Sequence, residues 1–162
     1  MNVYLAGPIA GNTTDEANDW RRTAQLNLAQ SDINGISPLR TEPVPDGDVY
    51  PLSVEHDALW GKTTAIAAKN RFDMDRCDIT IAYLPDLHYL HFEHDKTAYG
   101  KLPSIGTMME LGYLKGIGKP SVVWTTEEYY INHPLVSSFA DWIVPTLEQA
   151  CELCEGLHRG YS

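Results

Sequence analysis

The chain opens with the stretch NVYLAGPIAG, residues 2–11, which sets the pattern for the rest of the fold. Asn2–Ala6 is a short apolar run that Gly7-Pro8 follows at once, so these residues predict a buried β-strand ending in a tight loop. Gly7 and Gly11 let the backbone approach a ligand closely, although the Gly-x-Gly-x-x-Gly spacing of a dinucleotide-binding loop is absent. The loop is therefore either an ordinary strand-to-helix connection or part of a binding site.

A helix is predicted directly after this loop. Thr13 or Thr14 can cap a helix that runs from about Asp15 to Gln30, with Asp15 and Glu16 in the first turn, where acidic side chains are favoured. Apolar residues at spacings of three and four mark its inward face: Ala17, Trp20, Ala24 and Leu28.

Strand and helix patterns then alternate along the chain. Further strands are predicted at residues 33–37, 78–84, 120–124 and 142–144. Further helices are predicted at about 63–76, from a cap at Ser104 or Thr107 to about 116–118, and at 135–139. A final amphipathic helix is predicted from a Thr146 cap through Leu157. Residues 41–60 and 85–102 are predicted to be long loops, and loops of this length are often functional.

This order predicts an α/β fold: a doubly wound, mainly parallel five-stranded sheet with helices on both faces, of Rossmann or flavodoxin type. In such sheets ligands bind beyond the carboxyl ends of the strands. The site is therefore expected on the loops that follow Ala6, Ser37, Leu84 and Trp124.

Length and charge narrow the function. At 162 residues the chain is expected to form one domain over 1–162, and with 43% hydrophobic and 21% charged residues it is expected to fold. Its 12 Lys and Arg against 22 Asp and Glu give a net charge of −10, which counts against duplex nucleic acid and anionic membranes as partners. We find neither the ~20-residue apolar run of a membrane span nor the positive N-terminal region of a signal peptide.

The three cysteines, Cys77, Cys151 and Cys154, are odd in number and too few for a disulfide framework, which favours a cytoplasmic location. Cys151 and Cys154 form a Cys-x-x-Cys in a predicted helix, but no second pair accompanies them. We expect both to be packing residues rather than metal or redox groups.

Two further segments carry residues suited to chemistry. Asn70–Asp78 lies at a helix end before a strand and is, by composition alone, a solvated helix terminus. Ser104–Tyr113 places Glu110 near the start of a helix, between Met109 and Leu111. A helix N-terminus favours an ionised carboxylate, and such a group can attack a sugar anomeric carbon; the alternative is a surface glutamate with a capping role.

Two other patterns are weaker. Trp60–Thr64 ends like a phosphate-binding loop, but His56 stands where that motif needs glycine. His88, His91 and His94 recur every three residues in a predicted loop, which leaves a metal-dependent enzyme as one alternative, although the spacing matches no common zinc pattern. Base stacking or loop packing is the other interpretation of these histidines.

Taken together, the segments resemble the nucleoside 2-deoxyribosyltransferase family, including its branch that hydrolyses nucleoside 5′-monophosphates. The resemblance covers nearly the whole chain through motifs in a fixed order: Tyr4–Ile9, Asp19–Arg21, Ser37–Arg40, Asp73 with Arg76–Asp78, Ser104–Thr107 with Glu110–Gly112, and Lys119-Pro120. It implies an enzyme that breaks the N-glycosidic bond without a metal or a cofactor. It also implies a homodimer or larger homo-oligomer, in which Asn132, His133 or Ser137 could complete a neighbouring pocket.

The resemblance implies roles for single residues. Glu110 matches the nucleophile that attacks C1′, and Tyr4 matches the tyrosine that orients it. Gly7, Pro8 and Ile9 match the lining of the base and sugar pocket. The motif Ser104–Thr107, with Gly106 and Thr107, matches the segment that binds the sugar and its 5′ substituent.

This chain departs from the family at one position. The family has an aspartate near the leaving base where this chain has Asn70, and an amide can form a hydrogen bond but cannot act as an acid. The resemblance then implies either that Asp73 or Asp75 is the acid or that acid catalysis is weaker.

A second position bears on the 5′ substituent. Family nucleoside transferases tend to have an aspartate where this chain has Ser104, and the monophosphate hydrolases tend to have serine. A hydroxyl at a helix N-terminus donates to a phosphate, which a carboxylate would repel. Ser104 therefore favours 5′-monophosphates, with Arg21 or Arg40 as a balancing cation.

The remaining alternative is a non-catalytic nucleotide-binding or sensing module on the same fold, because a fold does not determine a function. The base, the tolerance of ribose, and the choice between transfer to a second base and transfer to water stay open at this stage.

Overall fold

The computed structural model describes residues 1–40, 49–50, 63–87 and 103–160. Within them the elements follow one another as β1 (Asn2–Ala6), α1 (Thr14–Ala29), β2 (Asn34–Ile36), α2 (Thr63–Arg76), β3 (Ile79–Tyr83), α3 (Ile105–Gly116), β4 (Ser121–Trp124), α4 (Glu128–Ile131), α5 (Pro134–Phe139), β5 (Trp142–Val144) and α6 (Leu147–Arg159).

The five strands form one parallel sheet in the order β2-β1-β3-β4-β5. This is the flavodoxin-like order, and it confirms the predicted fold class. Residues Val3–Ala6 of β1 pair with Ile79–Ala82 of β3. From β1 the chain continues to β2 on one side, and from β3 it continues to β4 on the other side. The boundary between β1 and β3 is therefore the topological switch point, and in folds of this type ligands bind at the carboxyl ends of the strands there.

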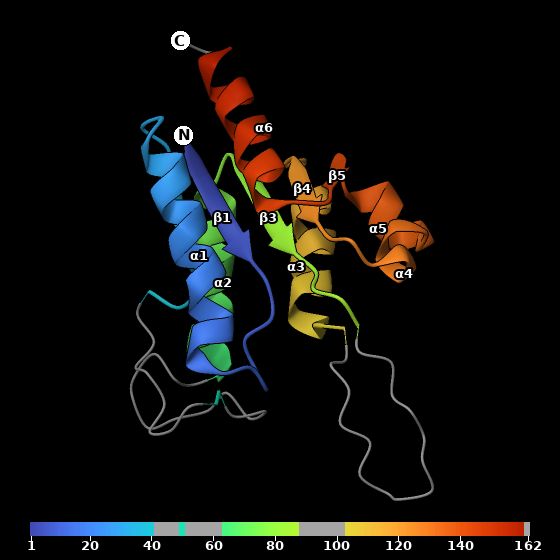
Figure 1. The fold of residues 1–162 in the computed structure, drawn as a ribbon. Helices are drawn as coiled ribbons and strands as arrows, with labels where there is room; N and C mark the ends of the chain where they lie inside the picture. The colour runs from blue at the N-terminus through green and yellow to red at the C-terminus, as the bar shows by residue number, and fades with distance from the viewer. Residues whose placement is uncertain (41–48, 51–62, 88–102, 161–162) are drawn as a thin grey trace, which may run out of the picture.

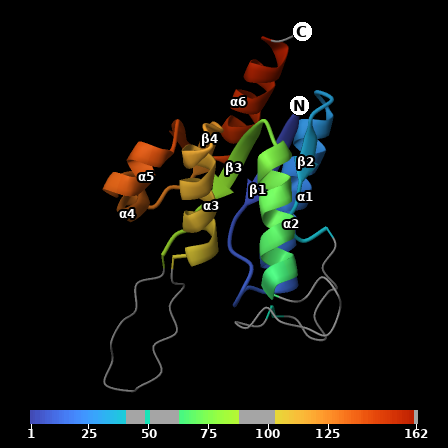
Figure 2. The ribbon, with the colours of Figure 1, turned by 180° about the vertical axis from the view of Figure 1, so that it is seen from behind.

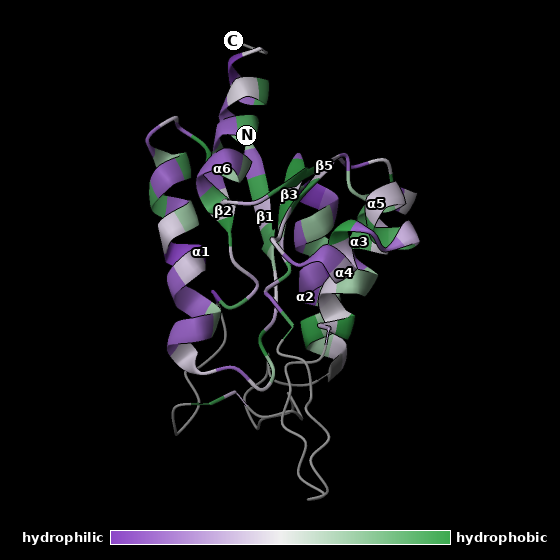
Figure 3. Cartoon of the chain, turned by 45° about the vertical axis from the view of Figure 1, so that its right-hand side comes forward, coloured by the Kyte–Doolittle hydropathy of each residue, from purple (hydrophilic) through white to green (hydrophobic). Residues whose placement is uncertain are grey.

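Helices cover both faces of the sheet, with α1 and α6 on one face and α2 and α3 on the other (Figures 1 and 2). Successive side chains of a strand point to opposite faces. In β1, Val3 and Leu5 therefore pack with α1 and α6, whereas Tyr4 and Ala6 pack on the side of α2 and α3. Figure 3 shows the apolar colouring of the strands between more polar helices.

The start of α1 follows the sequence closely. Thr13 caps the helix in a capping box, in which its hydroxyl accepts from the Glu16 backbone N–H and the Glu16 carboxylate accepts from the Thr13 backbone N–H. All four residues of the predicted inward face are buried. The predicted helix is confirmed, with its first residue one position earlier than expected.

Two differences from the predicted elements have local causes. The strand β2 starts at Asn34 because the Ile33 backbone N–H still bonds to the Leu28 carbonyl, at 3.1 Å, in the turn that closes α1. The sequence did not predict α4, since its four residues are too few to show a helical period. Most of the two predicted long loops lies outside the described residues.

The three cysteines are free thiols buried in the core, as expected of packing residues. Burial raises the pKa of Cys151 to about 11 and that of Cys154 to about 12. Among the helices of the described segments, none combines the length and the apolar character that crossing a bilayer requires.

Candidate active site

The site is organised around Glu110, in the second turn of α3, beside the carboxyl end of β1. The Tyr4 hydroxyl donates to Glu110 Oε1 at 2.7 Å. Tyr4 is fully buried, because its position in β1 points it to the face that α2 and α3 cover. A strand residue thus fixes the carboxylate of a helix residue.

A third element reaches the same oxygen. Asn70, in the middle of α2, donates from Nδ2 to Glu110 Oε1 at 3.2 Å. Its other amide atom, Oδ1, is buried and has no hydrogen-bond partner among the described residues. The structure therefore brings together three of the four predicted catalytic residues, Tyr4, Asn70 and Glu110, from β1, α2 and α3.

Burial dominates the electrostatics of this carboxylate. Burial raises the pKa of Glu110, whereas the Tyr4 hydrogen bond, the Arg21 cation, the Asn70 hydrogen bond and the Lys69 cation lower it without cancelling that rise. The balance differs from the expectation that the helix N-terminus favours the ionised form. Glu110 lies in the second turn, and the effect of the helix dipole is largely confined to the first.

Tyr4 remains a donor in this environment. Burial, and then the neighbouring charge of Glu110, raise the pKa of the Tyr4 phenol well above its usual value near 10. The phenol therefore keeps its proton across the physiological range and holds the carboxylate in one orientation.

Arg21 lies behind the site rather than in it. It is only 1% exposed, and its guanidinium donates to the carbonyls of Leu5 at 3.2 Å, of Gly7 at 2.8 Å, and of Ala17. Burial lowers the pKa of Arg21 to about 10, so the group stays cationic at neutral pH. Arg21 or Arg40 is proposed from the sequence as the balancing cation for a phosphate; in this structure the Arg21 guanidinium bonds to backbone carbonyls and anchors the end of β1 and the loop that follows.

Gly7 is packed too closely for any other residue. A Cβ atom at this position would lie 2.6 Å from Trp20 Cζ2 and 3.3 Å from Arg21 Nη2. The glycine thus lets the loop approach α1, which is a packing reason for the motif. Pro8 and Ile9 follow on the partly exposed loop, where Ile9 packs against a small core of Ala17, Leu39 and Tyr50.

Arg40 and Asp73 are paired with each other. The guanidinium of Arg40 donates to both carboxylate oxygens of Asp73, which is 3% exposed. This pair ties α2 to the segment after β2 and requires an ionised carboxylate, which counts against Asp73 as a proton donor. Asp75, the other predicted acid, is exposed and accepts from the Tyr113 hydroxyl at 2.6 Å.

The start of α3 presents one polar group. Ser104 caps the helix, and its Oγ accepts from the Thr107 backbone N–H at 3.3 Å and from the Thr107 hydroxyl at 2.9 Å. Since Oγ accepts in both bonds, its own O–H is left to donate. Gly106 is exposed, whereas Thr107 is buried and its two hydrogen bonds hold the Ser104 side chain in place.

Lys69 is a site residue that the sequence analysis does not identify. This residue is 6% exposed, donates from Nζ to the Pro38 carbonyl, and lowers the pKa of Glu110 through its charge. The helix α2 has no strong hydrophobic period, so the sequence does not show which of its side chains, Lys69 included, are buried. The position of Lys69 immediately before Asn70 is the one clue that the sequence offers.

The two weaker sequence patterns lie wholly or mostly outside the described residues. His88, His91 and His94 lie outside the described residues, as does Trp60–Lys62. In the part of the chain that the structure describes, no three His, Cys, Asp or Glu side chains gather in a way that could hold a metal ion.

The fold and the site define a class: a parallel α/β protein with a partly buried, hydrogen-bonded carboxylate close to the neighbouring strands β1 and β3. The model of the family described as nucleoside 2-deoxyribosyltransferase matches residues 3–154, so the chain belongs to that family. No curated protein matches the sequence.

Solved structures share the fold at low identity. They include a 2-deoxyribosyltransferase of Bacillus psychrosaccharolyticus, at 20% identity, 92% of this chain, 89% of that chain and TM-score 0.59. A 2-deoxyribosyltransferase of Leishmania mexicana has 18% identity, 97% and 98% coverage of this chain and that chain, and TM-score 0.63. A CMP N-glycosidase of Clostridium botulinum has 13% identity, 97% and 99% coverage, and TM-score 0.53. At these identities the likeness shows the fold alone.

Proposed function

We propose that the chain cleaves the N-glycosidic bond of 2′-deoxyribonucleosides or their 5′-monophosphates and transfers the sugar to another base or to water. The observation that carries this proposal is the pair of donors, Tyr4 Oη and Asn70 Nδ2, on one oxygen of the partly buried Glu110. A partly buried carboxylate that two hydrogen bonds hold in one orientation is suited to nucleophilic attack at an anomeric carbon.

In the first step a carboxylate oxygen of Glu110 attacks C1′ on the face opposite the base. The C1′–N bond breaks through an oxocarbenium-like transition state, its electron pair goes to the base nitrogen, and a covalent glutamyl-deoxyribosyl ester forms. Asn70 has no acidic proton, and Asp73 is ion-paired with Arg40. We therefore assign the proton on the departing base to solvent.

In the second step a base nitrogen or a water oxygen attacks C1′ from the face that the first base left. The ester C1′–O bond breaks, its electrons return to the Glu110 carboxylate, and the acceptor gives its proton to solvent. Two displacements give a product with retained configuration.

The Ser104 hydroxyl is suited to donate a hydrogen bond to a 5′-phosphate. Its O–H lies at the N-terminus of α3, where backbone N–H groups and the helix dipole favour an anion. No carboxylate occupies this position, and an acidic residue would repel the phosphate. These features favour 5′-monophosphates over nucleosides.

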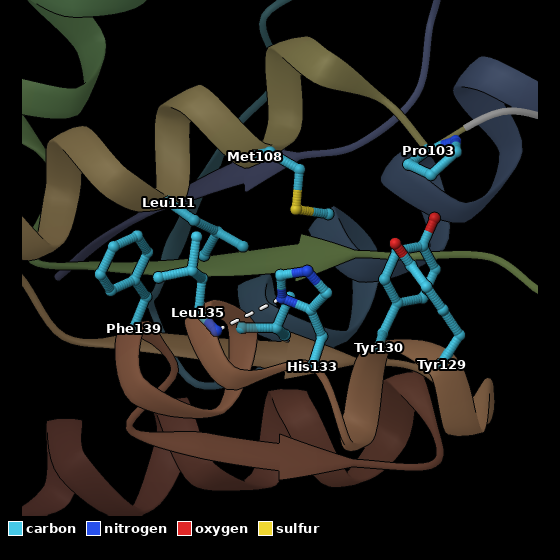
Figure 4. Close-up of a pocket in the computed structure, with 9 residues that line it drawn as sticks. Pro103, Met108, Leu111, Tyr129, Tyr130, His133, Leu135 and Phe139 are labelled. Carbon is cyan, nitrogen blue, oxygen red and sulfur yellow. Dashed lines mark hydrogen bonds between the residues drawn. The ribbon is translucent and has the colours of Figure 1, made fainter.

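We also propose that the protein works as a homo-oligomer. Beside the site, α3, α4 and α5 surround an apolar pocket of about 170 Å³, shown in Figure 4, whose lining includes Met108, Tyr130, His133 and Phe139. Large apolar side chains on the same helices face solvent: Ile105 is 76% exposed, Met109 70% and Leu135 58%. A second copy of the chain that covers them would remove this surface from water.

The three residues proposed to act across such an interface lie in this region. Asn132 and His133 cap α4 and α5, and Ser137 lies within α5. In the single chain the Asn132 amide donates to the Glu128 carbonyl, and His133 Nδ1 accepts from the Leu135 backbone N–H.

The deciding experiment incubates the full chain with each deoxynucleoside and its 5′-monophosphate, with and without an acceptor base, and separates the products by chromatography. Free base or an exchanged nucleoside is expected. Glu110→Ala should lose at least ~10³-fold in rate, as expected for loss of a covalent nucleophile, whereas Glu152→Ala on the exposed side of α6 should not change it. Near-normal turnover by Glu110→Ala would refute the role of Glu110. Binding without any product would favour the non-catalytic nucleotide-binding module.

A further inference from the structure

The amide of Asn70 has one satisfied end and one unsatisfied end. Nδ2 donates to Glu110 Oε1 at 3.2 Å, while Oδ1 is buried and accepts no hydrogen bond from the described residues. A buried acceptor without a donor is unfavourable, and an exception of this kind calls for an explanation. Its place, one amide away from the proposed nucleophile, points to a group that arrives with the substrate.

The opposite orientation of the Asn70 amide would not satisfy both of its ends. Rotation by 180° would put Oδ1 against the Glu110 carboxylate, and two acceptors repel each other whenever Glu110 is ionised. The proposed reaction requires the ionised carboxylate. Nδ2 therefore faces Glu110 during catalysis, and Oδ1 faces a second direction beside it.

The stereochemistry of the reaction says which part of a substrate is near. The nucleophile approaches C1′ on the face opposite the base, which is the α face of a β-nucleoside. In ribose the hydroxyl on C2′, the neighbouring carbon, lies on that same α face. A side chain that is hydrogen-bonded to the nucleophile therefore lies beside the 2′ position.

Resting on the proposed function, we propose that Asn70 is a specificity-determining residue whose Oδ1 accepts a hydrogen bond from the 2′-hydroxyl of ribose, so that ribonucleosides and their 5′-monophosphates are also substrates. Because the atom is covered in this structure, the sugar reaches it when the neighbouring side chains move aside. The 2′-hydroxyl then supplies the donor that the protein does not.

Such a bond also meets a chemical need of ribose substrates. An electronegative 2′-hydroxyl opposes the positive charge that develops at C1′, so ribosides ionise less readily than 2′-deoxyribosides. Hydrogen bonds to a sugar 2-hydroxyl strengthen in glycosidase transition states. An amide acceptor provides this bond without placing a second negative charge beside Glu110.

The test compares four sugars on one base, each as the nucleoside and as the 5′-monophosphate: ribose, 2′-deoxyribose, 3′-deoxyribose and arabinose. In arabinose the 2′-hydroxyl is on the opposite face. We expect kcat/KM for the ribose and 3′-deoxyribose compounds to be at least equal to that for 2′-deoxyribose, and arabinose to fall roughly tenfold or more below ribose. Cleavage of the 2′-deoxy compound without cleavage of the ribose compound would overturn the inference.

Variants then assign the effect to Asn70. Asn70→Leu keeps the size of the side chain but removes both polar atoms, and Asn70→Ala provides a smaller replacement should leucine not fit. Both should lower the ribose to 2′-deoxyribose ratio of kcat/KM about tenfold, beyond the loss that both substrates share when Glu110 loses a donor. An unchanged ratio would contradict the inference even if both rates fall.

A matched control is Gln25→Met on α1, whose amide donates to the Gly35 carbonyl at 2.8 Å, away from the site. It should leave the ratio unchanged. The two proposals fail in different ways: no cleavage of any sugar rejects the proposed function, whereas cleavage with an Asn70-independent sugar preference rejects only this inference.

Discussion

The Tyr4 hydroxyl oxygen and Glu110 Oε1 lie 2.7 Å apart, although 106 residues separate them in the chain. The sheet makes this contact possible, because alternate residues of β1, Tyr4 among them, face the side that α2 and α3 cover. One hydrogen bond thus links the fold to the chemistry proposed for it.

Tyr4→Phe removes that bond and little else. Among the contributions that lower the pKa of Glu110, the Tyr4 hydrogen bond is the largest, so its loss should raise this pKa further. The ionised nucleophile would then be lost at a higher pH as the solution is acidified. We expect kcat/KM to fall about 10- to 100-fold, as for a hydrogen bond to a charged group, and the acidic limb of its pH profile to move to higher pH. An acidic limb that stays in place would show that Tyr4 does not tune Glu110.

Glu110→Gln should stabilise the protein at neutral pH while it removes activity. Burial raises the pKa of Glu110 in the folded state, so ionisation costs folding free energy at a pH above the folded-state pKa. Below the ordinary glutamate value, near ~4.3, both states are protonated and that cost disappears. The free energy of unfolding of the glutamine variant should therefore exceed that of the wild type at pH 8, and the difference should shrink on acidification.

Urea titrations at several pH values measure this difference. Glu152→Gln on the exposed surface of α6 is the matched control and should show no comparable gain. A glutamine variant that is less stable than the wild type at pH 8 would mean that the donors around Glu110 outweigh its burial.

The sequence predicts the sheet well because every strand except β2 is a short, largely apolar run next to a turn signal. Trp142–Val144 and Asn2–Ala6 were placed at their observed bounds. The sheet order follows from alternation of strands and helices, which allows few topologies. Two local predictions differ from the structure. The four-residue helix α4 is too short to show a helical period. Ile33 is predicted as part of a strand, although its N–H bonds to the Leu28 carbonyl in the turn that closes α1.

The site was harder to predict because a residue's type does not show what it contacts. Arg21 is proposed from its charge as a balancing cation, and it also shares a helical face with Ala17, Ala24 and Leu28, at spacings of three and four. That spacing, not its charge, indicates where it lies. Lys69 and the Arg40–Asp73 pair depend on how α2 packs against the segment after β2, and no local pattern encodes that contact.

Asp73→Asn separates a structural role from an acid role. If Asp73 is an ion-pair partner, as its two bonds from Arg40 indicate, the variant should lose stability while the shape of its pH–rate profile stays that of the wild type. We expect a loss of about 1–3 kcal/mol, since a charged partner of a buried carboxylate is left with a weaker acceptor. A wild-type profile with a basic limb that Asp73→Asn abolishes, with little change in stability, would instead assign the proton on the leaving base to Asp73.

Met109→Glu tests the proposed interface on the α3–α5 surface. Met109 is 70% exposed and lies one helical turn from Ile105, which is 76% exposed, so a charge here sits within the apolar surface without disturbing the core. If copies of the chain meet at this surface, burying an unpaired carboxylate should shift light-scattering masses from a multiple of 18.1 kDa toward 18.1 kDa. Leu26→Glu is the matched control, because Leu26 is also 70% exposed but lies on α1, and it should leave the mass unchanged.

If the neighbouring copy completes each pocket, activity should fall with the mass and recover as protein concentration rises. A wild-type mass of one chain, or a Met109→Glu mass equal to that of the wild-type oligomer, would exclude this surface as the interface.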